Sequence, residues 1–511
     1  MRSGVSTFAA ALLVALQSVA ASAESPPLDA AAIRAKVAAA QGARPATYRQ
    51  TTVWTRPGWT ETTTVIRRGE DFREIVDEGS FHHEDGSVDG HRWHQNENGQ
   101  TIIDHAVPDE LSKTVPATTT TVRRITTPVD GYAIAELDDQ GHGTRELVDA
   151  TTWRLVRRDE ITAHFTLTTL FDDFRSERGY TFAHHTSIQG PKIRVDGTVT
   201  AFDASPVAAD AVAIPPMRRL LVEFPAGKGS VDLPATFIDG EIVVRITVGG
   251  RGLDFVLDTG ARGITIDNGV ARELGLQTYG EYRDFAAGPY TSGHARIPEM
   301  RVGDLTMHDV AVQLAPETGD DGAFVKTVGL LGFDFLAELG VTIDYEHQRV
   351  TVVREPDYRP PAGPHVIALD ARVGEGAPYV PVAVNGTPSN EFLLDTGGQS
   401  TFLIFPAFAR RHPEALVDIG NGPTDPRLVF FTGIGGAVRT KLYELKSVRV
   451  GPIDFRNQIG FVVTSHAYDD GDDGIIGSAF LRLFTVGLDY ANERVYLVPN
   501  AVGRRAMHIT D

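Results

Sequence analysis

The chain has 511 residues, of which 42% are hydrophobic, enough for about three domains of ordinary size with buried cores. Its formal net charge of −19 argues against a nucleic-acid-binding surface, because phosphate binding needs basic patches. The chain has no cysteine, which excludes a disulfide framework, a zinc–thiolate site, a thiol protease and a cysteine-linked lipid anchor.

The first 23 residues have the pattern of a secretory signal peptide. Arg2 precedes an apolar stretch from Phe8 to Leu16, and the small residues Ala21-Ser22-Ala23 form a cleavage site before Glu24. No later run approaches the about 20 apolar residues that a membrane helix needs. The sequence therefore predicts a periplasmic or secreted protein with a cleaved signal peptide and no stable membrane span.

Residues 24–205 are predicted to form a β-rich accessory domain. A short helix is expected from Asp29 to Gln41. Three later stretches, Thr60–Arg67, Thr119–Arg124 and Ile193–Val199, are rich in β-branched residues with partial period-two alternation. This pattern is typical of antiparallel strands.

Part of this region resembles the outer-membrane lipoprotein-sorting proteins. The resemblance is carried by Glu146–Leu155, Phe171–Arg175 and Gly179–Phe182. It implies an antiparallel half-barrel over a helix, and it carries no catalytic residue. An unrelated β-rich module is the alternative interpretation.

Histidines gather in the same region, at His82, His83, His91 and His94, beside Glu84 and Asp85. His91 and His94 are close enough in the chain to converge on one metal ion. Histidines in such a pattern are more often solvated loop residues. We therefore expect no metal site here and no cofactor.

Proline-rich segments divide the rest of the chain. Residues 206–217 are the predicted linker after the accessory domain, and residues 356–364 are the predicted linker between two lobes. The lobes are expected at 218–355 and 365–500, followed by a tail at 501–511.

Each lobe carries an Asp-Thr-Gly triplet at the end of an apolar run, at Phe255–Gly260 and Phe392–Gly397. An isolated triplet is most often a turn. Here each is followed by a matching block, Gly329–Gly332 or Gly474–Gly477. The two lobes also match beyond these blocks, where Val341–Val353 corresponds to Val486–Val498. This correspondence identifies an internal duplication. Short helices are expected after each block, at 333–339 and 478–483.

These motifs resemble the retropepsin-like aspartic proteases, in which an apolar-apolar-Asp-Thr-Gly-Ala segment is completed by a later apolar-apolar-Gly. The first triplet, with Ala261, fits in full, and the second departs only by Gly398 in place of Ala. The resemblance implies a mainly β fold with a pair of acid-protease-like barrels. It also implies that Asp258 and Asp395 form one catalytic dyad, with both halves in one chain.

Two carboxyls can share the work of peptide hydrolysis, because one takes a proton from water while the other donates a proton to the scissile carbonyl. Held about 3 Å apart, they cannot both ionise, so the pair carries a single proton. The sequence does not assign that proton to either aspartate.

The resemblance also implies supporting roles around the dyad. The hydroxyls of Thr259 and Thr396 would hydrogen-bond the opposite lobe. Gly260 and Gly397 leave room for a tight turn toward the carboxylates. Gly332 and Gly477 end the blocks whose apolar residues, Leu330, Leu331, Ile475 and Ile476, would pack beneath the aspartate loops.

A flap should cover the cleft and exclude water. In the second lobe, the glycine-rich segment around Gly433, Ile434, Gly435 and Gly436 resembles a retroviral flap tip, with an ordinary glycine-rich turn as the alternative. In the first lobe, the equivalent stretch contains Tyr290, which could serve as a flap tyrosine.

The sequence therefore predicts a hydrolase, an aspartic endopeptidase with peptide or protein substrates. The alternative is a non-catalytic peptide-binding or envelope-assembly protein on the same fold. A third possibility pairs each lobe with a lobe of another chain. The length of chain between the aspartates favours closure within one chain at lower entropic cost, so we expect a monomer. Whether the first domain is removed as a pro-segment stays open.

Overall fold

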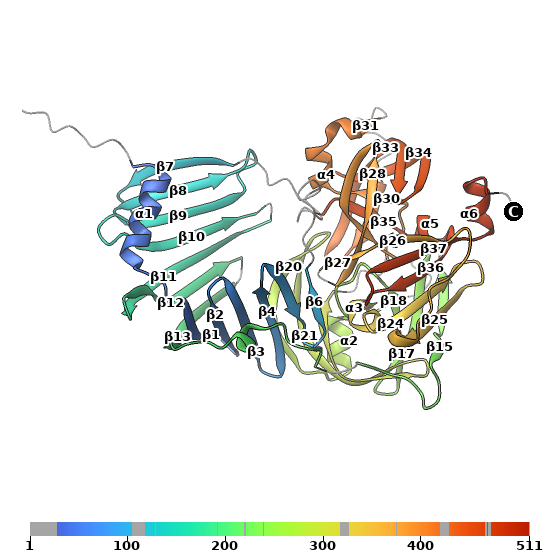
Figure 1. Ribbon diagram of the computed structural model, residues 1–511, viewed down its shortest axis with the longest axis horizontal. Coiled ribbons are helices and arrows are strands. Elements are labelled where there is room, and N and C mark those ends of the chain that lie inside the picture. Colours follow the sequence, from blue (N-terminus) through green and yellow to red (C-terminus); the bar gives the residue numbers. More distant parts are fainter. Residues whose placement is uncertain are drawn as a thin grey trace, which may run out of the picture.

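The computed structural model describes residues 28–509, apart from 105–117, 128, 163, 192, 219–220, 239, 317–325, 375, 419–428, 466–467 and 469–471. The predicted signal peptide lies outside these residues. The described part is mainly β (Figure 1), and its strands form sheets of thirteen, nine, six and nine strands. None of its helices is long and apolar enough to cross a membrane.

The N-terminal domain is one curved antiparallel sheet in the order β6-β5-β4-β3-β2-β1-β13-β12-β11-β10-β9-β8-β7, a half-barrel with helix α1 on one side (Figure 1). The elements are α1 Ala30–Gln41, β1 Thr47–Arg56, β2 Trp59–Arg68, β3 Asp71–Glu78, β4 Phe81–Val88, β5 His91–Gln95, β6 Thr101–Ile103, β7 Thr119–Ile125, β8 Gly131–Leu137, β9 Gly143–Asp149, β10 Leu155–Ile161, β11 Thr166–Glu177, β12 Tyr180–Gly190 and β13 Ile193–Asp203. The predicted helix and the three predicted strands are confirmed.

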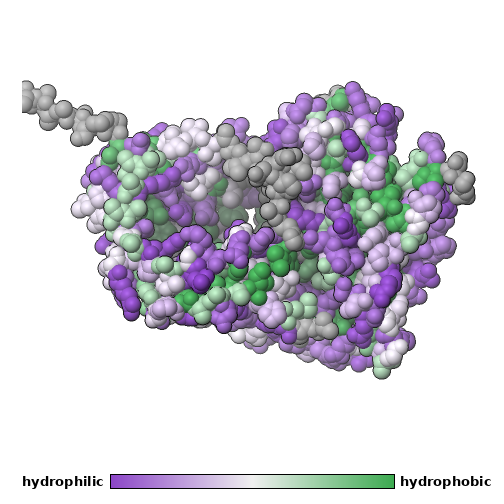
Figure 2. Space-filling view, in the orientation of Figure 1, coloured by the Kyte–Doolittle hydropathy of each residue, from purple (hydrophilic) through white to green (hydrophobic). Residues whose placement is uncertain are grey.

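Helix α1 begins directly after Asp29, which caps it. The Asp29 carboxylate accepts a hydrogen bond from the Ala32 N–H at 2.7 Å, which satisfies one of the free donors of the first turn. Ile33 of this helix is fully buried against Ile134 and Val148 of the sheet. On the face seen in Figure 2, the surface is largely hydrophilic and the concave side of the curved sheet is visible as a hollow.

The first lobe follows a 3₁₀ helix at Ala209–Val212. Its elements are β14 Val222–Glu223, β15 Ser230–Asp232, β16 Ala235–Ile238, β17 Glu241–Val248, β18 Arg251–Leu257, β19 Thr265–Asp267, α2 Asn268–Glu273, β20 Thr278–Phe285, β21 Pro289–Val302, β22 Leu305–Ala315, β23 Leu330–Leu331, α3 Phe333–Leu336, β24 Leu339–Asp344 and β25 Arg349–Arg354, with a 3₁₀ helix at Glu355–Asp357.

The second lobe repeats the same plan. Its elements are β26 Ile367–Asp370, β27 Arg372–Gly374, β28 Ala377–Val384, β29 Thr387–Leu394, β30 Phe402–Ile404, α4 Pro406–Arg411, a 3₁₀ helix Pro413–Ala415, β31 Val417–Asp418, β32 Val429–Gly433, β33 Gly436–Val450, β34 Ile453–Val463, β35 Gly474–Ile476, α5 Ser478–Leu481, β36 Phe484–Asp489, β37 Arg494–Pro499 and α6 Ala501–Ala506.

A six-stranded sheet joins the two lobes, in the order β15-β25-β24-β36-β37-β26. At its centre β24 pairs antiparallel with β36, so that Gly340 lies opposite Asp489 and Asp344 opposite Thr485. These strands come from the repeated segments of the duplication. The two halves of the chain are therefore related across this sheet, and the predicted two-lobed fold is confirmed.

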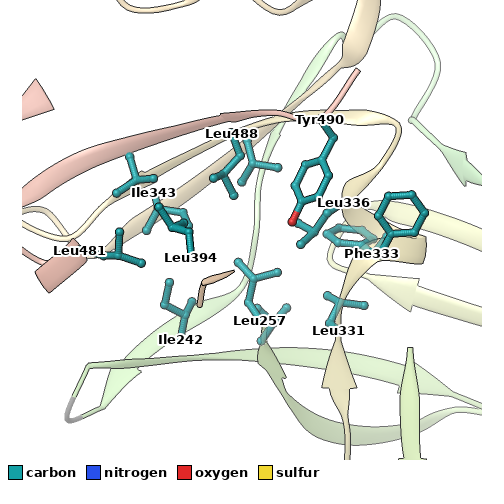
Figure 3. Close-up of a cluster of buried hydrophobic side chains, with 14 of the residues drawn as sticks. Ile242, Leu257, Leu331, Phe333, Leu336, Ile343, Leu394, Leu481, Leu488 and Tyr490 are labelled. Atoms are coloured by element: carbon teal, nitrogen blue, oxygen red, sulfur yellow. The ribbon is translucent and has the colours of Figure 1, made fainter. Parts of the chain in front are cut away.

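The core lies between this sheet and the strands that carry the Asp-Thr-Gly triplets. Figure 3 shows Leu257 and Leu394, the residues before the two aspartates, among Ile242, Leu331 and Leu481. All five side chains are fully buried. Full burial of one such side chain stabilises a fold by about 1.5–3 kcal/mol. The two aspartate loops thus rest on fully buried apolar side chains.

The helices after the support blocks are shorter than predicted. α3 ends at Leu336 rather than at 339, and α5 ends at Leu481 rather than at 483. A two-residue turn follows each helix, and the central sheet begins at Leu339 of β24, which pairs with Arg354 of β25, and at Phe484 of β36. The short connection to the sheet therefore ends both helices earlier than local propensity predicts.

Candidate active site

The two aspartates occupy matching places at the ends of β18 and β29. Each of these strands runs parallel to a short support strand, β23 or β35. The Asp258 N–H donates to the Leu331 carbonyl at 3.1 Å, and the Asp395 N–H donates to the Ile476 carbonyl at 2.9 Å. The apolar blocks thus fix the backbone of both aspartates in the same way.

The triplet glycines bring the two carboxyls together. The Gly260 N–H donates to Asp258 Oδ1 at 2.7 Å, and the Gly397 N–H donates to Asp395 Oδ1 at 2.8 Å. A Cβ on Gly260 would lie 2.9 Å from Cγ of Asp395, and one on Gly397 would lie 2.6 Å from Cγ of Asp258. Each glycine therefore lies against the carboxyl of the opposite lobe, where a side chain would obstruct the pair.

The two threonines cross-link the lobes. Thr259 Oγ1 donates to the Leu394 carbonyl at 2.6 Å, and Thr396 Oγ1 donates to the Leu257 carbonyl at 2.7 Å. Each hydroxyl also accepts the backbone N–H of the other threonine at 3.0 Å. Both residues are fully buried, so these hydrogen bonds have no competition from water.

Replacing one of these hydroxyls by a methyl group should weaken the contact between the lobes. Thr396→Val keeps the shape of the side chain but leaves the Thr259 N–H and the Leu257 carbonyl without their partner. We expect the free energy of unfolding to fall by about 2–4 kcal/mol, since each buried unsatisfied group costs about 1–3 kcal/mol. Urea denaturation measures the loss. Thr351→Val, which removes an exposed hydroxyl on β25, is the control, and an equal loss in both variants would contradict the prediction.

Gly332 and Gly477 lie beneath the aspartate loops. A Cβ on Gly332 would lie 2.3 Å from the carbonyl oxygen of Ala261, and one on Gly477 would lie 2.2 Å from that of Ser400. Only glycine fits such a close approach of two backbone segments. Each support block can therefore pack directly under the loop that follows its aspartate.

The surroundings raise the pKa of both aspartates. Burial raises the pKa of Asp258 well above its usual range, and the neighbouring charge of Asp395 raises it further. Burial also raises the pKa of Asp395, while a hydrogen bond with Asp258 opposes that rise. Hydrogen bonding thus stabilises the ionised form of Asp395 and the protonated form of Asp258. The pair titrates as one unit.

The predicted flap segment is a β-hairpin made by β32 and β33, with Ile434 and Gly435 at its turn. The equivalent stretch of the first lobe is also a hairpin, made by β20 and β21, and Tyr290 is buried on its second strand. The tips of the two hairpins meet, because the Ala287 N–H donates to the Ile434 carbonyl at 2.9 Å.

The tip contact depends on Gly435. Its φ is +86°, and a Cβ there would lie 2.1 Å from the Gly288 carbonyl oxygen. Gly435→Ala should therefore separate the tips and speed hydrogen exchange of the Ala287 amide by about tenfold or more. The control is Gly386→Ala, at φ +90° with no atom within 4 Å, which carries the same backbone strain without the clash. Unchanged exchange at Ala287 in Gly435→Ala would overturn this prediction.

The expectation that the clustered histidines lie in solvated loops is wrong. His82 and His83 belong to β4, and His91 and His94 belong to β5. His82 contacts Asp77 and Glu84, His83 contacts Glu97, and His94 contacts Asp85. The described residues include no group of three or more His, Asp or Glu side chains arranged to hold a metal ion.

The sequence interpretation missed Asp334, a buried carboxyl close to the first aspartate loop. Asp334 Oδ2 accepts the Ile264 N–H at 3.0 Å, and Oδ1 accepts the Asn96 side-chain amide of the N-terminal domain at 2.7 Å. Burial raises the pKa of Asp334 to about 7. One signal was available, because the duplicated segment of the second lobe has Ala479 at this position.

Parts of the chain are similar to known proteins. A family model described as aspartyl protease matches residues 244–335 and 380–480. An aspartic proteinase from Irpex lacteus is similar at 14% identity, with a TM-score of 0.34, covering 54% of this chain and 99% of that one. A LolA-superfamily protein from Nitrosomonas europaea is similar at 9% identity, with a TM-score of 0.28, covering 37% of this chain and 98% of that one. No curated protein matches the sequence. The matched segments carry both Asp-Thr-Gly triplets and both support blocks, so the two lobes are similar to the aspartyl protease family, as the motifs predicted.

Proposed function

We propose that this protein is an aspartic endopeptidase that hydrolyses peptide bonds with a water molecule activated jointly by Asp258 and Asp395. The observation that carries the proposal is the close approach of the two carboxyls, of which that of Asp395 is buried and that of Asp258 half-buried. Each one lies against the triplet glycine of the other lobe, and the pKa of both is raised.

In the proposed reaction the dyad starts with one proton. The ionised carboxyl, favoured at Asp395, takes a proton from water as the oxygen attacks the scissile carbonyl carbon. The protonated carboxyl, favoured at Asp258, donates its proton to the carbonyl oxygen. Collapse of the tetrahedral diol breaks the C–N bond as the carboxyl of Asp395 gives its proton to the leaving nitrogen. The carboxylate of Asp258 takes a proton back from one hydroxyl of the diol, which restores the dyad with a single proton. No covalent bond to the protein forms.

The remaining site residues have supporting roles in this proposal. Thr259 and Thr396 keep the two carboxyls in register, which matters because small displacements of reacting groups are costly. The hairpin tips with Ile434 and Gly435, and the strand that carries Tyr290, would close over a bound peptide. From the sequence of residues 1–23, the protein would work in the periplasm or outside the cell, on peptide or protein substrates.

The proposal is tested with the purified chain and a diverse peptide pool, from acid to neutral pH. We expect internal cuts in extended peptides, and incorporation of one ¹⁸O atom from labelled water into each new carboxyl group. A folded protein that binds peptides but cuts none at any pH would sink the proposal. It would favour a peptide-binding or envelope-assembly role for the same groove.

A further inference from the structure

A turn of the N-terminal domain reaches into the first lobe beside the aspartate loop. The turn connects β5 with β6 and comprises residues 96–100. The side chains of Asn96, Asn98 and Gln100 are exposed by only 8%, 3% and 1%, although all three are polar. Buried amides of this kind are stable only when they are hydrogen-bonded. Their partners therefore indicate what the turn does.

The partners lie in the first lobe. Asn96 Nδ2 donates to Asp334 Oδ1 at 2.7 Å, and Gln100 Nε2 donates to the Asp334 carbonyl at 3.0 Å. Asn98 holds both backbone groups of Ala311, accepting its N–H at 2.8 Å and donating to its carbonyl at 3.0 Å. The turn thus completes the hydrogen bonding of one residue on α3 and of one on β22.

Both of these elements hold Ile264, six residues after the catalytic Asp258. The Ile264 N–H donates to Asp334 Oδ2 at 3.0 Å, and the Ile264 carbonyl accepts the Gln313 N–H of β22 at 2.9 Å. The backbone of Ile264 is therefore fixed on each side by an element that the turn contacts.

The space beside this contact is open. A cavity of about 510 Å³ lies between the two domains, and both the turn and the segment Arg262–Ile264 line it. The side chain of Ile264 is fully buried in the core, but the loop faces this cavity instead of packing against the N-terminal domain along its whole length. The buried hydrogen bonds of the turn therefore add to the packing that holds the loop on this side.

The duplication supplies an independent comparison. In the second lobe, Ala479 stands at the position of Asp334, so that lobe has no carboxylate there. The carboxylate is present in the lobe that the N-terminal domain contacts through Asn96. The asymmetry between the lobes follows the domain contact.

We propose that the turn 96–100 is a positioning element of the protease, which holds the loop of Asp258 in register with Asp395 through Asp334 and β22. The N-terminal domain is then a permanent part of the active enzyme and not a removable pro-segment. The kinetic part of this inference rests on the proposed function. The coupling between the domains can be tested by hydrogen exchange, without any measurement of activity.

The test uses the full chain and the variants Asn96→Ala, Asp334→Ala and their double combination. We expect each single variant to speed hydrogen exchange of the Ile264 amide by about tenfold or more, and the double variant to add little, because both changes break one network. On peptide substrates, kcat should fall by about 10- to 100-fold, because the variants displace the reacting carboxyl of Asp258. KM should change by less than about twofold.

Two further variants separate positioning from general stability. Asn500→Ala removes an equally buried side-chain amide in the second lobe. The Asn500 side chain accepts the N–H groups of Val502 and Gly503 and donates to the Arg482 carbonyl. We expect it to alter neither the exchange at Ile264 nor kcat. Asn96→Asp combined with Asp334→Asn exchanges donor and acceptor while keeping the net charge, and should restore both readouts.

Unchanged exchange at Ile264 in Asn96→Ala and Asp334→Ala would overturn the inference, whatever the activity. Failure of the exchanged pair to recover kcat or exchange would also overturn it. If the wild-type chain cuts no peptide, the proposed function fails by itself, and the exchange measurements still decide whether the turn holds the loop.

Discussion

Asp258→Asn and Asp395→Asn are each expected to lower kcat by at least about 10³-fold at every pH, with the fold intact. One dyad member must accept a proton and the other must donate one, and an amide does neither. General acid–base catalysis contributes about 10²- to 10⁴-fold, and here both functions depend on the same pair. The measurement is the steady-state rate on a peptide identified from the pool, followed from acid to neutral pH.

The same substitutions should leave the free energy of unfolding at neutral pH unchanged or higher. Burial raises the pKa of both carboxyls, so an ionised dyad opposes folding, and a neutral amide removes that cost. Asp454→Asn, which changes an exposed carboxyl on β34, is the control that should keep full activity. Either dyad variant retaining more than a tenth of wild-type kcat would contradict a shared role.

Asp334 should make the protein less stable as the pH rises from about 4 to about 7. Its pKa is about 7 in the folded protein against an ordinary value of 3.8, so the folded state binds the proton more tightly than the unfolded chain. Below about pH 4 Asp334 adds no pH dependence to the free energy of unfolding, because its carboxyl is protonated in both the folded and the unfolded state. Above that pH the unfolded chain loses the proton first, and the free energy of unfolding falls. A shift of about three pKa units corresponds to about 4 kcal/mol.

This slope should largely disappear in Asp334→Asn, which cannot titrate. Urea denaturation at several pH values between 4 and 8 measures the difference in slope between this variant and the wild type. The comparison matters more than the absolute slope, because burial also raises the pKa of the dyad and contributes with the same sign in the wild type and the variant. Parallel curves for the two proteins would show that Asp334 is not the titrating group.

Local patterns predicted those parts of the fold whose causes lie within short segments. Asp29 caps α1, and β-branched runs form β2, β7 and β13, because capping and strand pairing need only local residue types. The lengths of α3 and α5 were overestimated, because the chain turns directly after Leu336 and Leu481 to enter the central sheet. The histidines near residue 90 lie on strands. His82, His94 and His83 contact carboxyl groups on β3, on β4 and in the turn after β5, respectively.

The two-lobed region could be predicted from residues 235–500 alone, because the duplicated Asp-Thr-Gly triplets and support glycines are short motifs whose roles depend on backbone sterics and carboxyl chemistry. The way in which the accessory domain meets this region could not be predicted. The contact of Asn96 with Asp334 joins residues more than 200 positions apart, and neither residue has a distinctive local pattern. Such hydrogen bonds arise from the docking of two finished domains. The elevated pKa of Asp334 likewise comes from burial at that interface, which no local segment encodes.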